Sequence, residues 1–252
     1  MYNDISRSSF EMETISVISL PTYTSPIYSP NKDDNDDTSY IIISFRLKII
    51  IIILFILVVA ISNRTQKGKI LSCIDDTLHN ATASINQFFH THPIPRYTLM
   101  SIGSICIDTI FLYSVFDWAL NFSSMRVIVC WITFYSIRGI IQFTFEMPFP
   151  PGYFWGNPYM PSLIVSYLDT NDFFFSGHVA FPLMTGLHYY YESKQYQYFF
   201  CFMTVIIEMF LVLITRVHYS IDIVIGLAFG HYIFMIVNRY ICVIDSFFKM
   251  EK

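Results

Sequence analysis

The chain has 252 residues, of which 54% are hydrophobic and only 13% are charged, about half the charged fraction of a typical soluble domain. This composition argues against a water-soluble protein and predicts one that spans a membrane. The net charge of −4, without a basic surface, argues against a nucleic-acid partner.

The first 40 residues differ in composition from the rest of the chain. They are rich in Ser, Thr, Pro, Asp and Asn, and they carry seven acidic side chains against two basic ones. Such a segment buries too little apolar area to offset the conformational entropy lost on ordering. We therefore expect a disordered, acidic cytoplasmic tail over residues 1–40, followed by one catalytic membrane domain over residues 41–245.

Six apolar segments follow this tail, each near the roughly 20 residues needed to cross the hydrocarbon core of a bilayer. Their approximate ranges are 43–62, 97–119, 125–146, 177–192, 197–216 and 220–241. The sequence thus predicts an all-α, polytopic membrane protein with a bundle of six transmembrane helices. The fourth segment is the shortest and the most polar of the six.

The connecting segments indicate an orientation. Residues 147–175 contain no Lys or Arg, so the positive-inside tendency places this loop on the non-cytoplasmic side and both termini in the cytoplasm. Residues 63–96 would share the side of that loop and include a short helix on the membrane surface. The basic residues Arg64, Lys67 and Lys69 argue for the opposite orientation.

Two short motifs carry candidate reactive groups. Ser176-Gly177-His178 opens the fourth span, and His218 and Asp222 are four residues apart between the fifth and sixth spans, a spacing that shares one helix face. Asp222 would accept a hydrogen bond from one imidazole nitrogen of His218 and leave the other as a nucleophile for a phosphodiester, giving a phosphohistidine. His178 would protonate the leaving oxygen and later activate the acceptor hydroxyl.

Four further residues are candidates for binding the phosphate. Ser176 and Gly177 would donate hydrogen bonds at a helix N-terminus, and Arg138 and Arg216 would neutralise its charge. If the six helices alternate in direction, all of these residues reach one face of the membrane together with His178 and His218. Ionisable groups at membrane depth are costly and therefore usually functional.

Other uses of these and nearby residues stay open. A divalent metal bound by the two histidines and Asp222 is an alternative, but no further ligand lies near them in the sequence, so we expect neither a metal nor another cofactor. Asp108 and Glu208 are acids inside spans, where helix packing is as good an explanation as function. Glu146 and Asp172 border the reactive loop and would be able to assist proton transfer.

These motifs resemble those of a known family. The similar segments are Arg138–Gln142, Met147–Pro150, Phe174–Ala180 and Thr215–Asp222. They resemble the sphingomyelin synthase-related lipid transferases of the type 2 phosphatidic acid phosphatase superfamily, and most of all the plant phosphatidylcholine:diacylglycerol cholinephosphotransferases. The resemblance covers roughly residues 75–240.

The resemblance implies a six-span enzyme that exchanges phosphocholine between phosphatidylcholine and a lipid alcohol without a metal. It assigns the nucleophile to His218 with Asp222 and the acid/base to His178. Diacylglycerol is the expected acceptor and ceramide the second choice. We expect an integral protein of the endoplasmic reticulum or Golgi membrane with a lumenal active site, and the sequence does not indicate an oligomeric state.

Two alternatives from other classes remain. The first is a lipid phosphate phosphatase that uses the same residues with water as the acceptor. It matches less well, because Phe175 replaces the usual Pro before Ser176 and Arg216 lies two residues before His218 rather than six. The second is a non-enzymatic lipid scramblase or scaffold, which the presence of all three reactive residues disfavours.

Overall fold

The computed structural model describes residues 45–64, 74–121, 124–167 and 173–248. Within these ranges the secondary structure is helical and contains no strand, which confirms the all-α class for this part of the chain. The described residues belong to one compact unit, Tyr40–Lys252. The predicted disordered tail, residues 1–40, lies outside the described residues.

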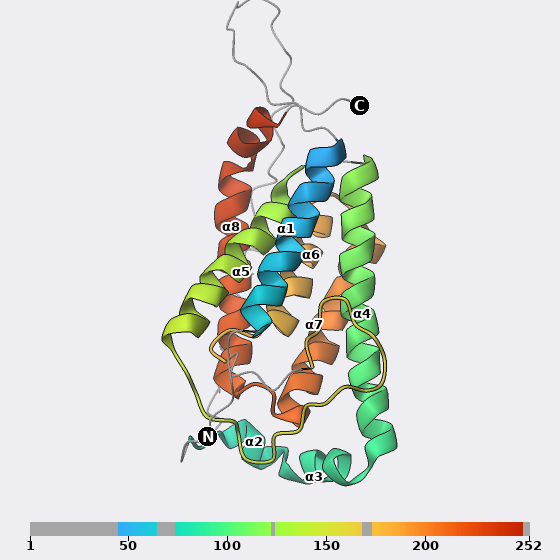
Figure 1. Cartoon of the computed structure of the whole chain (residues 1–252), viewed down its shortest axis with the longest axis vertical. Coiled ribbons are helices and arrows are strands. Elements are labelled where there is room, and N and C mark those ends of the chain that lie inside the picture. Colours follow the sequence, from blue (N-terminus) through green and yellow to red (C-terminus); the bar gives the residue numbers. More distant parts are fainter. Residues whose placement is uncertain (1–44, 65–73, 122–123, 168–172, 249–252) are drawn as a thin grey trace, which may run out of the picture. The chain divides into compact units, whose positions relative to one another are not determined.

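The described residues form eight helices. These are α1 (Phe45–Arg64), α2 (Thr77–Ala81), α3 (Ala83–Thr91), α4 (Pro93–Asn121), α5 (Arg126–Thr144), α6 (Gly177–Tyr191), α7 (Gln195–Thr215) and α8 (Ser220–Phe247). The two short helices, α2 and α3, lie across one end of the bundle, whereas the others run along its length (Figure 1). The short helix expected between the first two spans is therefore present as two.

Four of the helices in the described ranges, α4, α5, α7 and α8, are long and apolar enough to cross a membrane. Helix α6, the fourth predicted span, has 15 residues, and a helix of that length measures about 22 Å, less than the roughly 30 Å of hydrocarbon. Helix α1 has 20 residues, and the structure describes the side chains of its apolar part Lys48–Leu57. The structure thus supports an integral membrane protein, and the count of six spans stays a prediction.

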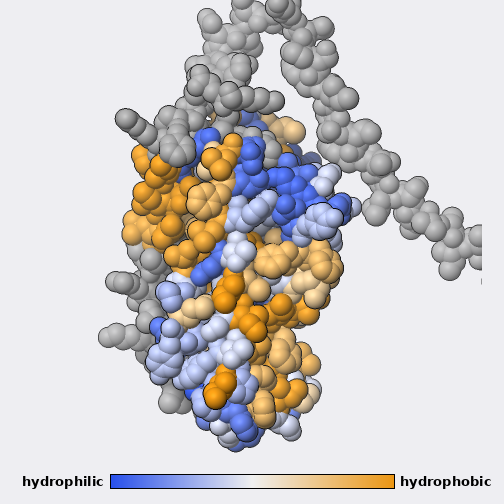
Figure 2. Space-filling model, turned by 90° about the vertical axis from the view of Figure 1, so that its right-hand side faces the viewer, coloured by the Kyte–Doolittle hydropathy of each residue, from blue (hydrophilic) through white to orange (hydrophobic). Residues whose placement is uncertain are grey.

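Large apolar side chains on the outside of the bundle fit this membrane setting. Phe116, Ile140, Phe143 and Phe199 are each more than half exposed. Hydrophobic residues cover broad areas of the face that carries α4 (Figure 2). Lipid tails would cover such side chains, since they are as apolar as the residues themselves.

Helix α6 lies inside the bundle and contacts α4, α5, α7 and α8. Ten of its 15 residues are buried. It approaches α8 closely because that helix presents glycines: a Cβ on Gly230 would lie 3.2 Å from the Cβ of Ala180, and one on Gly226 would lie 2.8 Å from the carbonyl oxygen of Ser176. Small residues are a common means of bringing membrane helices together.

The long connection between α5 and α6 is held against α4 by Asp108. Its carboxylate accepts hydrogen bonds from the amides of Leu163 (3.0 Å) and Ile164 (3.1 Å) and from the hydroxyl of Ser162 (3.1 Å). Asp108 therefore has a structural use, in line with the packing explanation. The same connection carries Trp155, which packs edge-on against His178 with ring centroids 5.5 Å apart.

The close contact at Gly226 gives a test of this packing. Gly226→Ala places a methyl group against the Ser176 carbonyl, so we expect the free energy of unfolding to fall by about 1–3 kcal/mol. Thermal unfolding of the full chain in detergent measures the change. Gly156→Ala is the matched control, because a Cβ there meets nothing within 4 Å; equal unfolding temperatures for both variants would contradict the packing.

Candidate active site

The start of α6 and the turn between α7 and α8 meet at one end of the bundle, and Asp222 joins them. Its Oδ1 accepts the amide of Phe174 at 3.0 Å, and its carbonyl oxygen accepts the amide of Ser176 at 3.1 Å. Its Oδ2 accepts the amide of Tyr219 at 3.0 Å, which closes a capping box at the start of α8. One fully buried residue thus fixes the beginning of α8 to the segment that enters α6.

His218 lies beside this carboxylate, as predicted. Its Nδ1 is 3.5 Å from Oδ2 of Asp222, and both side chains are completely buried. This separation is longer than a hydrogen bond but allows the carboxylate to stabilise an imidazolium ion. The expected shared helix face is wrong in detail, because α8 begins at Ser220 and His218 lies in the turn before it. Neither ring nitrogen of His218 has a hydrogen-bond partner.

His178, on the first turn of α6, faces His218. The two ring centroids are 6.0 Å apart and the rings are inclined by 67°. The predicted convergence of the two imidazoles at one face is therefore present. The His178 side chain is 15% exposed, so it is the more accessible of the two.

Glu208 of α7 is the site residue to which sequence reasoning gave no role. Its Oε2 lies 2.9 Å from Nδ1 of His178, and its side chain is fully buried. A Cβ on Gly103 of α4 would lie 2.7 Å from the other carboxylate oxygen, so a small residue is needed to admit this acid. The signal was present in the sequence, because Glu208 is the one charged residue of α7.

Arg138, Ser176 and Gly177 lie together at the N-terminus of α6. The Nε of Arg138 donates to the carbonyl of Phe175 at 3.1 Å, and the guanidinium carbon is 3.6 Å from the position of a Cβ on Gly177. Ser176 is the N-cap residue, and its hydroxyl is buried without a hydrogen-bond partner. The first amides of a helix have no partner within it, so they add donors at the same place.

Arg216, the other predicted phosphate ligand, is engaged differently. It ends α7 in the left-handed conformation, with φ of 56°. Its Nη2 donates to the carbonyl of His79 at 2.8 Å, and its Nη1 donates to the carbonyl of Pro151. The guanidinium thus binds the backbone of α2 and of the α5–α6 connection, and phosphate binding by Arg216 stays a prediction.

Glu146 and Asp172 were the candidates for assisting proton transfer. Glu146 is exposed, and Asp172 lies outside the described residues. Cys106, Cys130, Cys201 and Cys242 are free thiols; three are at least partly buried, and Cys242 is exposed. The described ranges contain no cluster of three or more His, Cys, Asp or Glu side chains that would hold a metal ion.

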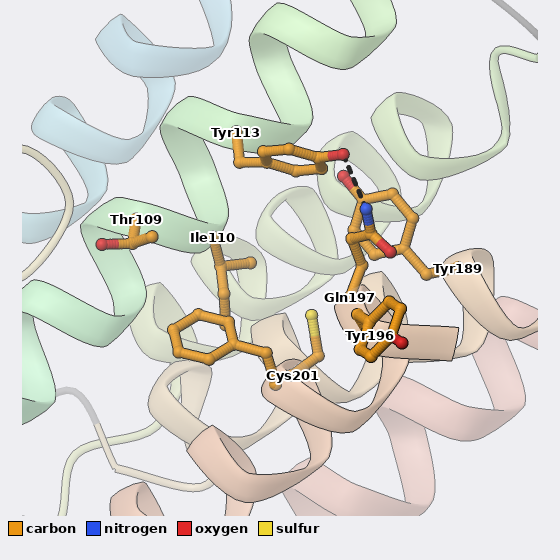
Figure 3. Close-up of a pocket in the computed structure, with 8 residues that line it drawn as sticks. Thr109, Ile110, Tyr113, Tyr189, Tyr196, Gln197 and Cys201 are labelled. Atoms are coloured by element: carbon orange, nitrogen blue, oxygen red, sulfur yellow. Dashed lines mark hydrogen bonds between the residues drawn. The ribbon is translucent and has the colours of Figure 1, made fainter. Parts of the chain in front are cut away.

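An apolar cavity of about 270 Å³ lies elsewhere in the bundle, between α4, α6 and α7 (Figure 3). Tyr113, Tyr189 and Cys201 are among its lining residues. It adjoins the start of α7, and the 14 residues from Cys201 to Thr215 correspond to about 21 Å of helix. The cavity is therefore distant from His218, which follows the other end of α7.

Comparison with known families places these residues in a context. Residues 75–239 match the family model described as AtPDCT1/2, the phosphatidylcholine:diacylglycerol cholinephosphotransferases. No curated protein and no solved structure matches the chain. The matched range begins just before α2, ends within α8 and includes every residue of the site described above. The chain therefore belongs to the phosphatidylcholine:diacylglycerol cholinephosphotransferase family.

Proposed function

We propose that this protein transfers phosphocholine from phosphatidylcholine to diacylglycerol through a phosphohistidine at His218. One observation carries the proposal: two imidazoles lie 6.0 Å apart at the bundle end, and each has its own buried carboxylate. Such a pair supplies a nucleophile and an acid/base on opposite sides of a phosphate. Family membership supplies the substrates.

In the first half-reaction His218 attacks the phosphorus of phosphatidylcholine. Because Nδ1 faces Asp222, the attacking atom is Nε2. A bond from nitrogen to phosphorus forms, the bond from phosphorus to the glycerol oxygen breaks, and His178 gives its proton to that oxygen. Diacylglycerol leaves, and Asp222 stabilises the positive charge on the phosphorylated imidazole.

The second half-reaction reverses these steps with a new acceptor. His178, now neutral, removes the proton from the hydroxyl of another diacylglycerol, and the resulting oxygen attacks phosphorus. The bond to His218 breaks, and a phosphatidylcholine with new acyl chains is released. Arg138, the Ser176 hydroxyl and the amides that begin α6 bind the phosphate oxygens throughout, as donors at a helix N-terminus do.

Glu208 is a positioning residue in this scheme. Because a carboxylate only accepts hydrogen bonds, Nδ1 of His178 donates to it, and Nε2 is left to exchange protons with the substrate. The negative charge of Glu208 also stabilises His178 in its protonated form, before the first half-reaction and after the second. A carboxylate that orients a catalytic histidine in this way is a recurrent arrangement.

Burial favours a transferase over a phosphatase. His218 is completely buried and only 15% of the His178 side chain is exposed, so a phosphohistidine here would be shielded from water. An enclosed site suppresses hydrolysis of a reactive intermediate. We place the site at the lumenal face on the charge of the connecting segments, and the protein in the endoplasmic reticulum or Golgi membrane on its resemblance to the lipid transferases.

The central test is exchange between lipids. Purified protein is given phosphatidylcholine labelled in choline and a diacylglycerol with distinguishable acyl chains, and labelled phosphatidylcholine with the new chains is measured. His218→Ala is expected to lower the rate by about 10³-fold or more, as loss of a nucleophile does. His231→Ala, an exposed histidine of α8, is the control with full activity. Release of free phosphocholine without an acceptor would instead indicate a hydrolase. Formation of labelled sphingomyelin when ceramide is added would identify ceramide as the acceptor.

The intermediate can be tested separately. With donor labelled in phosphorus and no acceptor, we expect label on the protein that is lost in acid and on addition of diacylglycerol. His218→Ala should carry no label. Labelling that persists in this variant would place the covalent step at another residue.

Glu208→Gln tests the positioning role. The amide keeps the shape of the side chain but removes its charge, so we expect kcat to fall about 10–100-fold with little change in KM. The control is Glu192→Gln, because Glu192 pairs with Arg126 at the C-terminus of α6, away from the histidines. Equal kcat values for Glu208→Gln and the unaltered protein would remove Glu208 from the mechanism.

A further inference from the structure

We propose that α2 positions the nucleophile, with His79 as a positioning residue that holds the turn between α7 and α8. The contacts of the turn alone support the claim that α2 holds it in place. The effect of this support on catalysis rests on the function proposed above. His79 lies outside every motif that pointed to the site.

Alternate residues of the turn are bound to α2. Arg216 donates from Nη2 to the carbonyl of His79 at 2.8 Å. The carbonyl of His218 accepts from Nε2 of His79 at 3.0 Å. The amide of Ser220 donates to Oδ2 of Asp76 at 2.6 Å. The turn is therefore bound at three positions to α2 and its N-cap residue.

His79 is held in one form at this contact. A carbonyl only accepts hydrogen bonds, so Nε2 carries the hydrogen, while Nδ1 is buried without a partner. Burial lowers the pKa of His79, although Asp76 and the carbonyl of His218 act against it, and Arg216 and Asp222 are the other charged groups that influence it. The side chain is 3% exposed, and its ring stacks on Tyr219 at a centroid distance of 5.7 Å.

Helix α2 is itself fixed to the end of the bundle. Asp76 is its N-cap residue, and Oδ1 accepts the amides of Leu78 (3.0 Å) and His79 (3.3 Å) while Oδ2 accepts Ser220. Burial raises the pKa of Asp76, but these hydrogen bonds and His79 outweigh it, so the pKa is below its usual value and the carboxylate is ionised at neutral pH. A single carboxylate therefore caps α2 and anchors the start of α8.

The turn needs this support because helical hydrogen bonds do not fix it. His218 precedes the first residue of α8, and Arg216 adopts a left-handed conformation that is unfavourable for residues other than glycine. The His218 ring has no hydrogen bond of its own. Its place opposite His178 is therefore set by the main chain, between α2 on one side and Asp222 on the other.

Small movements of this main chain matter for the reaction. If the His218 carbonyl loses its donor, its peptide is held on one side only, by the bond from the Tyr219 amide to Asp222, and the ring can shift from its alignment with the phosphorus atom. A displacement of about 1 Å in a reacting group can lower a rate about 10²-fold. His79 thus acts through His218 without contact with the reacting atoms.

The test uses two substitutions of His79 in the full chain. His79→Leu removes the donor, and His79→Gln keeps an N–H group of similar reach. We expect kcat per folded molecule to fall 10–100-fold in His79→Leu, with KM for phosphatidylcholine within about threefold and phosphohistidine formation slowed equally. His79→Gln should restore most of the rate.

Asn86→Leu is the matched control, because Asn86 ties α3 to the carbonyls of Ile214 (2.8 Å) and Gly152 (3.0 Å) without touching His218. We expect it to lower the unfolding temperature but not kcat per folded molecule. The proposal would be overturned if kcat fell equally in Asn86→Leu and His79→Leu, or in neither. Helix α2 would then stabilise the fold without positioning His218.

Amide hydrogen exchange separates this proposal from the proposed function. His79→Leu should raise exchange in the peptide 216–220 at least tenfold over the unaltered protein, whatever the reaction is. An unchanged exchange rate would overturn the positioning role even if lipid transfer is observed. Faster exchange in a protein that transfers no phosphocholine would leave the support of the turn in place and reject the proposed reaction.

Discussion

The site depends on the bonds made by Asp222. Its carboxylate accepts the amides of Phe174 and Tyr219, and its carbonyl oxygen accepts the amide of Ser176, so one residue joins the start of α8 to the segment before α6. Phe174 has a positive φ of 85°, which is unfavourable for a bulky residue. Its bond to Asp222 offsets that cost and holds the start of α6 so that its first turn presents His178 to His218.

The apolar surroundings explain why both histidines have acidic partners. A buried imidazolium without a counter-ion would be strongly disfavoured, and buried carboxylates have the same difficulty. Glu208 beside His178 and Asp222 beside His218 answer both requirements. Glu208 belongs to α7 and Asp222 to α8, so each histidine keeps its own carboxylate in place when it gains or loses positive charge.

The sequence predicted the parts of this arrangement that follow from local spacing. The Ser176–His178 motif and the pair of His218 with Asp222 adjoin helix ends, and the reversal of direction between successive helices was enough to bring them together. To predict that Glu208 contacts His178, one would need the position of Glu208 along α7 and the angle between α6 and α7. No local sequence pattern contains this information. The hydrogen bonds of Arg216 were not predictable, because its acceptors are backbone carbonyls and every residue type has one.

Helix α6 shows a second limit of sequence composition: it does not predict what surrounds an apolar helix. Its apolar residues and length resembled a short membrane span, yet its burial comes from protein on every side, because α4, α5, α7 and α8 all contact it. Hydropathy alone does not distinguish lipid from protein as the apolar neighbour. The N-terminus of this enclosed helix is shielded from water, because Ser176 is fully buried and only 15% of the His178 side chain is exposed. That placement gives the N-terminus of α6 the greatest effect on a phosphate, since partial charges act most strongly where water is excluded.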